Sequence, residues 1–299
     1  MEYLLVRLVF ALPTLMSFRA RNRLLLAIMR FVYRMSAEVR DRIGNNLAHA
    51  FPDRDDNWRR QLAYENLEYL ARMMAEFLQY PRVDAHFFKQ WFGFEKGPAA
   101  FADQLNQGGI LILGHLGSWE WKGIAITHTC KAPLYVFAKR QSNPWANAYV
   151  ARMRSSQNIK LIYTDESPRK AMKLIKEGAL VAFIADQDAG PGATFYDFCN
   201  RPAATYHGPA MFARLTGAPL HFVWSHHDEH GRLILGHRPF DAPAQQKGRD
   251  GADWEREFTR AWVDLLEEKV YQYPADYYWL HNRWIARPGP DSIVVPKKN

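Results

Sequence analysis

Short apolar runs separated by amphipathic segments characterise the chain from residue 108 onward. The runs lie at 110–113, 134–137, 160–163, 180–184 and 220–224, and helical patterns at 118–128, 144–155, 168–177 and 207–216 separate them. The runs show no polar alternation, which is typical of strands that are covered on both faces of a sheet. Strands that alternate with helices of about ten residues predict an α/β fold with a largely parallel sheet flanked by helices.

Further patterns flank or follow these runs. Apolar residues between 57 and 78 fall on one helical stripe, and 254–266 predicts a second, late amphipathic helix. The segments 221–225 and 232–240 predict a hairpin whose exposed tip contains His226, His227, Asp228 and His230. A metal site made of these side chains is the less favoured interpretation, so we expect no metal.

The first 42 residues differ in character from the rest. Residues 4–16 are apolar, but at about 13 residues they fall short of the roughly 20 that span a bilayer. Eight arginines stand against three acidic residues in 1–42 and interleave with apolar stretches. This pattern predicts a membrane-associating helical segment at 1–42, lying on an anionic membrane surface. An ordinary helix pair packed on the domain and a single tilted span are the alternatives. An α/β domain at 43–286 and a basic, Pro-rich tail at 287–299 follow.

Composition limits the choice of partner. The 299 residues carry a formal net charge of +8, with a pI near 9.4, which favours nucleic acid, anionic lipid or an acidic carrier protein. No nucleic-acid-binding motif occurs, and the N-terminal arginines alternate with apolar stretches, so a nucleic-acid-binding protein is the remote alternative. Cys130 and Cys199 are the only cysteines, which excludes a disulfide framework and a cysteine-rich zinc site.

The candidate chemistry lies where the first apolar run ends. His115 follows Gly114 directly, and Ser118 is a good N-cap, so Glu120 falls in the first turn of the next helix. The carboxyl ends of strands are where ligands bind in open α/β sheets. From a strand-to-helix loop, His115 can meet Glu120, which would fix its tautomer and make it a general base for a hydroxyl. The spacing alone fits a capping histidine and a solvated glutamate equally well. The sequence contains no Gly-x-Ser-x-Gly elbow, the motif that would indicate a serine hydrolase.

Five blocks of sequence, in order, carry a resemblance to a known family. They lie at 45–52, 114–120, 139–154, 186–205 and 278–283, and the second has the spacing His, four residues, Glu. The chain resembles the lipid A biosynthesis acyltransferases, the late acyltransferases of Gram-negative bacteria in the lysophospholipid acyltransferase-like superfamily. It departs from the family in having both Lys139 and Arg140 before Asn143-Pro144, and Asn282 where an arginine is usual.

The resemblance implies an O-acyltransferase without a cofactor. Such an enzyme moves a fatty acyl chain from a thioester, on acyl carrier protein or as acyl-CoA, to a hydroxyl of a lipid A precursor. His115 would be the general base and Glu120 would orient it, at the cytoplasmic face of the bacterial inner membrane. Backbone amides of the 114–117 turn are candidates for stabilising the oxyanion. The alternative is an acyl-CoA-dependent enzyme for another glycolipid, such as phosphatidylinositol mannoside.

Six further residues are candidates for substrate binding. Lys139, Arg140, Arg152 and Arg154 form a basic set that could pair with acceptor phosphates or steer an acidic carrier protein. Asp186 and Asp188 end a buried run, at the position where α/β sites lie. For the last two arginines a solvated helix face is the alternative, and for the two aspartates it is turn formation.

Overall fold

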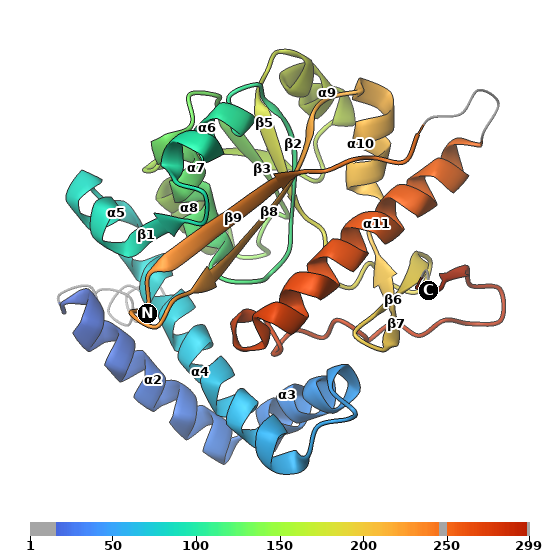
Figure 1. The fold of residues 1–299 in the computed structure, drawn as a ribbon. Helices are drawn as coiled ribbons and strands as arrows, with labels where there is room; N and C mark the ends of the chain where they lie inside the picture. Colours follow the sequence, from blue (N-terminus) through green and yellow to red (C-terminus); the bar gives the residue numbers. More distant parts are fainter. Residues whose placement is uncertain (1–15, 245–249, 298–299) are drawn as a thin grey trace.

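The computed structural model of the chain describes residues 16–244 and 250–297 (Figure 1). The apolar segment predicted at 4–16 lies almost entirely outside these ranges. Within them, no helix combines the length and the apolar character that crossing a membrane requires.

A seven-stranded sheet forms the centre of the molecule, in the order β1-β9-β8-β2-β5-β3-β4 (Figure 1). Neighbouring strands run parallel except for β8 and β9, which form the predicted hairpin. The strands are β1 (Phe92–Phe94), β2 (Gly109–Leu113), β3 (Leu134–Ala138), β4 (Lys160–Tyr163), β5 (Leu180–Ile184), β8 (Leu220–His227) and β9 (Leu233–Pro239). The prediction of an α/β fold with a largely parallel sheet is therefore confirmed.

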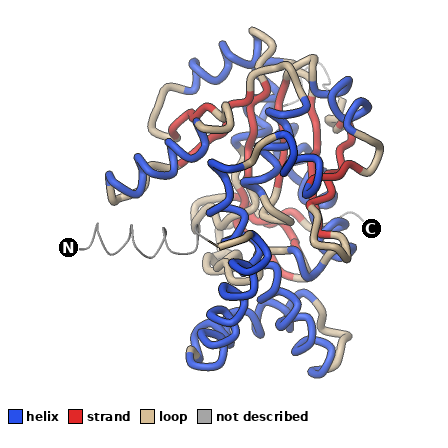
Figure 2. Tube along the Cα trace, turned by 90° about the vertical axis from the view of Figure 1, so that its left-hand side faces the viewer, coloured by secondary structure: helices blue, strands red, loops and turns tan. Residues whose placement is uncertain are grey.

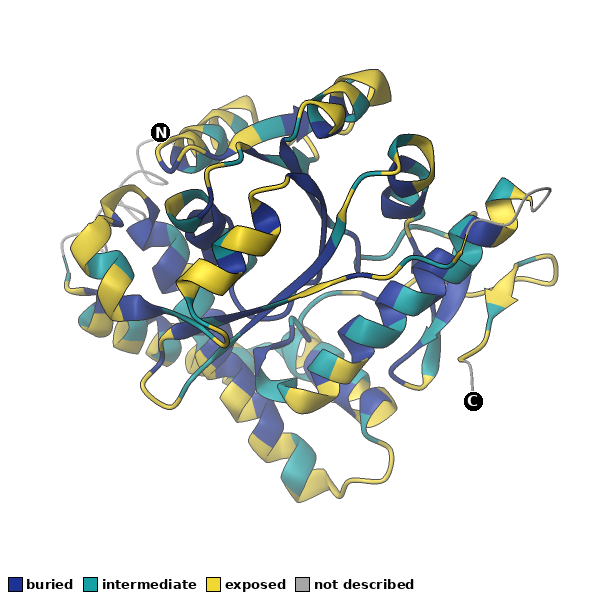
Figure 3. Cartoon of the chain, turned by 45° about the horizontal axis from the view of Figure 1, so that its top comes forward, coloured by how far each residue is buried: buried dark blue, intermediate teal, exposed yellow. Residues whose placement is uncertain are grey.

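Helices cover both faces of this sheet, and Figure 3 shows the central strands in the colour of buried residues. Strand β2 explains why its sequence lacks polar alternation: Ile110 and Ile112 pack in one core, and Leu111 and Leu113 pack in the other. The first core includes residues of α9 (Pro168–Lys176), α10 (Gly208–Thr216) and α11 (Gly251–Gln272). The second includes residues of α5 (Ala85–Trp91), α6 (Pro98–Leu105), α7 (Trp119–Thr129) and α8 (Pro144–Ser155).

Three N-terminal helices stand together at one end of the molecule (Figure 2). They are α2 (Phe18–Met35), α3 (Ala37–Ala50) and α4 (Asp56–Gln79), and the short helix η1 (Tyr80–Arg82) follows them. Helix α4 matches the amphipathic segment predicted at 57–78, and the side chain of Asp55 caps it by accepting from the Trp58 N–H.

A second, three-stranded sheet was not predicted. Its strands are β6 (Thr194–Phe198), β7 (Arg201–Thr205) and β10 (Val294–Val295), in the order β10-β6-β7. The hairpin residues include charged side chains and Pro202, so they form no apolar run in the sequence. Strand β10 falls in the segment assigned to the tail. After α11, the short helix η2 (Pro274–Asp276) leads into the segment that returns to this sheet.

The hairpin between β8 and β9 corrects one prediction. Strand β8 continues to His227, whose side chain is buried, and the turn is made by residues 228–232. The prediction that His226 and His227 lie at an exposed tip is therefore wrong. The buried side chain of His227 is paired with the carboxylates of Glu76 and Asp276.

Candidate active site

Strand register brings His115 and Asp186 together. Strands β2 and β5 are parallel neighbours in which Leu113 pairs with Ile184. His115 lies two residues beyond the first strand and Asp186 lies two residues beyond the second. Both side chains therefore emerge at the same edge of the sheet, at the carboxyl ends of its strands.

Asp186 holds both the backbone and the ring of His115. Its Oδ2 accepts from the His115 backbone N–H at 2.8 Å, and its Oδ1 lies 2.6 Å from Nδ1. Burial by itself raises the pKa of Asp186, but the neighbouring charge of His115, its two hydrogen bonds and Arg283 hold this pKa well below the usual range. Because the carboxylate is ionised, Nδ1 is the donor, and the free lone pair of the imidazole lies on Nε2.

Two glycines make this approach possible. A Cβ at Gly114 would lie 2.4 Å from a methyl carbon of Leu266 and 3.2 Å from the Asp186 carboxylate. Gly117 has φ +62°, and a Cβ there would lie 2.4 Å from the carbonyl oxygen of Ser225. Larger residues at either position would push the His115 turn away from the sheet.

Aromatic and amide side chains surround the imidazole. Trp119 meets it edge-on with ring centroids 4.6 Å apart, and the Tyr278 ring lies 6.1 Å away. The Tyr278 backbone N–H also donates to the His115 carbonyl at 3.0 Å. The Gln187 amide nitrogen lies 3.3 Å from Nε2, where it can donate to the free lone pair until a substrate hydroxyl replaces it.

Glu120 is engaged by an arginine. As predicted, Ser118 caps α7 and Glu120 lies in its first turn. Its carboxylate, however, forms a two-pronged ion pair with Arg154, at 2.6 Å to Nη2 and 3.2 Å to Nε. The predicted contact of Glu120 with His115 is not formed, and the orienting position is taken by Asp186. The assignment of Glu120 as a catalytic residue stays a prediction.

Lys122 lies beneath the His115 turn. Its Nζ donates to the carbonyl oxygens of Gly114 at 2.9 Å and Leu116 at 2.8 Å, the residues on either side of His115. Burial lowers the pKa of Lys122 to about 7, although the charge of Asp186 acts in the opposite direction. A single buried amine thus fixes the backbone on both sides of the imidazole.

A buried histidine between two carboxylates supports the same turn from further away. His227 Nδ1 lies 2.7 Å from Asp276, and its Nε2 lies 2.8 Å from Glu76 of α4. Burial lowers the pKa of His227, but the two carboxylates outweigh burial and raise it to about 9, so this histidine is a cation at neutral pH. The Asp276 carbonyl accepts from the Gly117 N–H at 2.8 Å, which links the network to the His115 turn.

These contacts bear on the expected oxyanion donors. The backbone N–H of His115 donates to Asp186, and that of Gly117 donates to Asp276. Two amides of the 114–117 turn are therefore already used and cannot also stabilise an oxyanion.

The remaining predicted residues are dispersed. Asp188 accepts from the backbone N–H groups of Gly190 and Ala286, so it fixes a turn and the C-terminal segment. Arg140 pairs with Asp165 at 2.8 Å and lies over the Tyr163 ring. Lys139 and Arg152 are exposed. With Arg154 held by Glu120, the four basic residues do not act as one set of free charges.

The fold and the site define an enzyme class. A histidine oriented by an ionised aspartate, at the carboxyl edge of a parallel α/β sheet, has the arrangement of a general base. In the described part of the chain, no serine, threonine or cysteine side chain hydrogen-bonds to the His115 ring. The site presents an oriented imidazole at the edge of the sheet where ligands bind.

Comparison with known proteins identifies the family. Residues 2–286 match the bacterial lipid A biosynthesis acyltransferase family. The chain is 26% identical to the lipid A biosynthesis lauroyltransferase of Escherichia coli (strain K12), over 94% of this chain and 89% of that protein. It is 25% identical to the palmitoleoyltransferase of the same strain, over 84% and 80%. A phosphatidylinositol mannoside acyltransferase of Mycolicibacterium smegmatis is 23% identical over 60% of this chain and 58% of its own length.

This chain belongs to the bacterial lipid A biosynthesis acyltransferase family and is an O-acyltransferase.

The sequence did not indicate several residues of the site. Gln187 lies between Asp186 and Asp188 but has no sequence signal of its own. Lys122 resembles an ordinary helix lysine. Asp186 was predicted as a lining residue rather than as the partner of His115. The signal that would have found it is the equal distance of His115 and Asp186 from the ends of two apolar runs.

Proposed function

We propose that this enzyme transfers a fatty acyl chain from a thioester on acyl carrier protein to a hydroxyl of a lipid A precursor. The observation that carries the proposal is the His115–Asp186 pair, in a chain of an acyltransferase family. Among residues 16–244 and 250–297, no side-chain nucleophile hydrogen-bonds to the imidazole. Two relatives, matched over 94% and 84% of this chain, are a lauroyltransferase and a palmitoleoyltransferase of lipid A biosynthesis, which supports the acceptor class.

The proposed reaction is a direct attack by the acceptor. His115 Nε2 takes the hydroxyl proton while the acceptor oxygen adds to the thioester carbonyl carbon. The tetrahedral intermediate then breaks its C–S bond, which gives an ester, and the imidazolium returns its proton to the thiolate as it leaves. Asp186 stays ionised throughout and stabilises the imidazolium, as the aspartate of a catalytic triad does.

Arg154 is the proposed oxyanion partner. Its Nε and Nη2 are held by Glu120, which leaves Nη1 to donate to developing negative charge. Burial lowers the pKa of Arg154, but the charge of Glu120 raises this pKa by a larger amount, so the guanidinium is a permanent cation. In this proposal Glu120 acts by positioning Arg154, and its carboxylate remains necessary to catalysis.

An assay with paired donors and acceptors tests the proposal. The full-length enzyme would receive acyl carrier protein and CoA thioesters of equal chain length, with a tetra-acylated, bis-phosphorylated glucosamine disaccharide as acceptor. We expect an additional ester on the disaccharide by mass spectrometry, and a higher kcat/KM with the carrier protein. A net charge of +8 favours this acidic donor.

Phosphatidylinositol mannoside is the second candidate acceptor, because one relative is named for it. The same assay with that lipid and acyl-CoA separates the two candidates. Transfer to the mannoside alone would reject the lipid A precursor as substrate.

Helix α2 supports a position on an anionic membrane surface, which we propose to be the cytoplasmic face of the bacterial inner membrane. Four large apolar side chains form one exposed stripe along it, at helical spacings of four, three and four residues: Leu24, Ile28, Phe31 and Met35. Phe31 is 65% exposed and Met35 is 67% exposed. The exposed Arg23 and Arg34 flank this stripe, which is the arrangement of a helix that lies on anionic lipid.

Replacing both Ile28 and Phe31 with aspartate is expected to weaken binding to anionic phospholipid vesicles by at least about tenfold, since each buried side chain contributes on the order of 2 kcal/mol. Flotation of the full chain with vesicles measures this change. Leu215→Asp, which alters an exposed apolar residue of α10, is the control and should bind as the wild type does. Equal binding by the double variant would reject α2 as the contact surface.

A further inference from the structure

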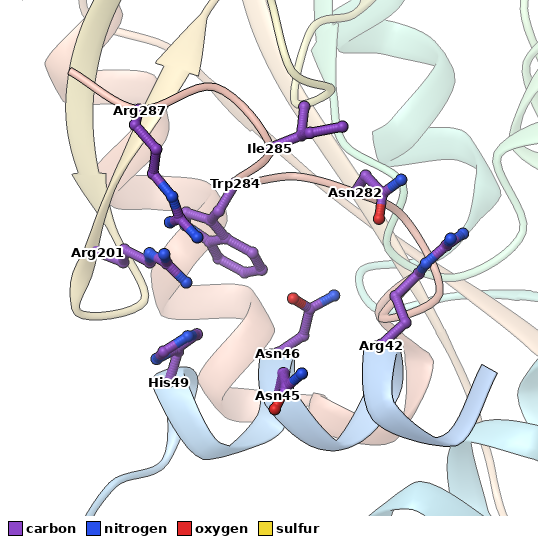
Figure 4. A pocket seen from close by; sticks show the side chains of 9 residues that line it. All are labelled: Arg42, Asn45, Asn46, His49, Arg201, Asn282, Trp284, Ile285 and Arg287. Atoms are coloured by element: carbon purple, nitrogen blue, oxygen red, sulfur yellow. The ribbon is translucent and has the colours of Figure 1, made fainter. Parts of the chain in front are cut away.

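A polar pocket of about 490 Å³ lies between α3, the β6–β7 hairpin and the segment that follows α11 (Figure 4). Helix α3 contributes Arg42, Asn46 and His49 to its wall, and the β6–β7 hairpin contributes Arg201. The segment after α11 completes the wall with Asn282, Trp284 and Arg287. The pocket has the size of a small-molecule site, and none of the residues predicted to bind substrate lines it.

The charge of this pocket is positive. Arg201, Arg287 and His49 gather at one end in Figure 4, and no carboxylate of residues 16–244 and 250–297 lies within ion-pair distance of the two arginines. Arg42 pairs with Glu38 at 2.6 Å, but the Glu38 side chain is 78% exposed and is easily exchanged for a ligand. Uncompensated guanidinium groups facing one concavity are suited to a phosphate, which they bind in two-pronged fashion.

The uncharged part of the wall is suited to a sugar. Trp284 is buried and donates its indole N–H to the Phe198 carbonyl, so it presents a ring rather than a polar group to the pocket. Asn45 and Asn282 are exposed and offer amide donors and acceptors, which match the hydroxyl and amide groups of an acylated amino sugar.

The pocket is connected to the catalytic histidine by one short segment. Asn46 donates to the carbonyl oxygens of Trp279 and His281, at 2.8 and 3.0 Å. Tyr278, between these residues, donates its backbone N–H to the His115 carbonyl. Burial raises the pKa of Tyr278, and the charge of Arg42 opposes that rise, so Arg42 also acts electrostatically on this segment. The pocket and His115 therefore contact the same short segment.

We propose that this pocket binds a phosphorylated amino-sugar headgroup of the acceptor, with Arg201 and Arg287 on the phosphate. The inference rests on the proposed function and adds where the acceptor is recognised. It also moves phosphate recognition away from Arg154, whose guanidinium group is held by Glu120. A concave site formed by three segments fits a compact headgroup better than the convex helical surface of a carrier protein.

Kinetics with two acceptors test the proposal. The double variant Arg201→Ala/Arg287→Ala would be compared with the wild type on the bis-phosphorylated disaccharide and on the same lipid without phosphates. We expect its kcat/KM on the phosphorylated acceptor to fall by at least about tenfold, because the variant loses at least one charge-assisted hydrogen bond to the phosphate. The preference of the wild type for the phosphorylated acceptor should disappear.

The control removes equal charge elsewhere. Arg169→Ala/Lys176→Ala alters α9, at the opposite end of the molecule from α3 in Figure 1, and should leave both kcat/KM values unchanged. A rise in KM for the carrier thioester, rather than for the acceptor, would overturn the proposal and assign the pocket to the donor. Wild-type kinetics in the double variant would overturn it as well.

A binding measurement keeps the inference separate from the proposed reaction. Saturation-transfer NMR with glucosamine 6-phosphate and with glucosamine, using inorganic phosphate as a competitor, needs no turnover. We expect glucosamine 6-phosphate to bind the wild type and to lose most of its signal with the Arg201/Arg287 variant. Full displacement of the sugar phosphate by an equal concentration of inorganic phosphate would reject the headgroup, and equal signals for the variant would reject the site. If the wild type transfers no acyl chain but binds the sugar phosphate, the proposed reaction fails and the pocket stands.

Discussion

Replacing His115 with alanine is expected to lower kcat by about a thousandfold or more, while KM for both substrates changes little. Nε2 of this imidazole is the group that can take the acceptor proton, since Nδ1 is committed to Asp186. Without a base, the neutral hydroxyl has to attack the thioester. Initial rates of ester formation, from the carrier thioester and the lipid A precursor, measure the loss.

The comparison variant for this experiment is His86→Ala. His86 is an exposed residue of α5, so its removal should leave both the rate and the thermal melting temperature as in the wild type. The His115 side chain is only 12% exposed, so the melting temperature of His115→Ala has to be measured too. A folded His115→Ala enzyme with near-normal turnover would falsify the general-base mechanism.

The strands and helices around this site could be predicted because each leaves a local signal. Five apolar runs became β2, β3, β4, β5 and β8, and the N-cap of α7 placed Glu120 in a first helical turn, as the structure has it. Such features depend on residues within a few positions of one another. Strand β6 and its partner β7 lack an apolar run, and the small sheet was missed for that reason.

Partners far apart in the chain could not be predicted in the same way. His115 and Asp186 are 71 positions apart, and their contact depends on which strands are neighbours and in what register. The same limit explains His227, whose surroundings depend on Glu76 from α4. A histidine in a polar hexapeptide resembles an exposed turn until the carboxylates that face it are known.

Replacing Asp186 with asparagine is expected to lower kcat by about a hundredfold to ten-thousandfold, with the substrate KM values largely retained. The amide matches the carboxylate in shape but can offer an N–H to Nδ1, which favours the tautomer with its proton on Nε2. That tautomer cannot accept the acceptor proton. The 15N chemical shifts of the His115 ring should show this proton moving from Nδ1 to Nε2.

A matched substitution decides whether Asp186 or Glu120 orients the histidine. Glu120→Gln removes the charge that holds Arg154, so it should lower the rate without moving the ring proton of His115, since Glu120 does not contact the imidazole. Asp103→Asn removes an exposed carboxylate of α6 and should change neither quantity. Movement of the ring proton in Glu120→Gln but not in Asp186→Asn would return the orienting role to Glu120. Movement of the ring proton in Asp186→Asn but not in Glu120→Gln would assign the orienting role to Asp186. The register of β2 and β5, rather than the spacing of His115 and Glu120, would then determine how the general base is oriented.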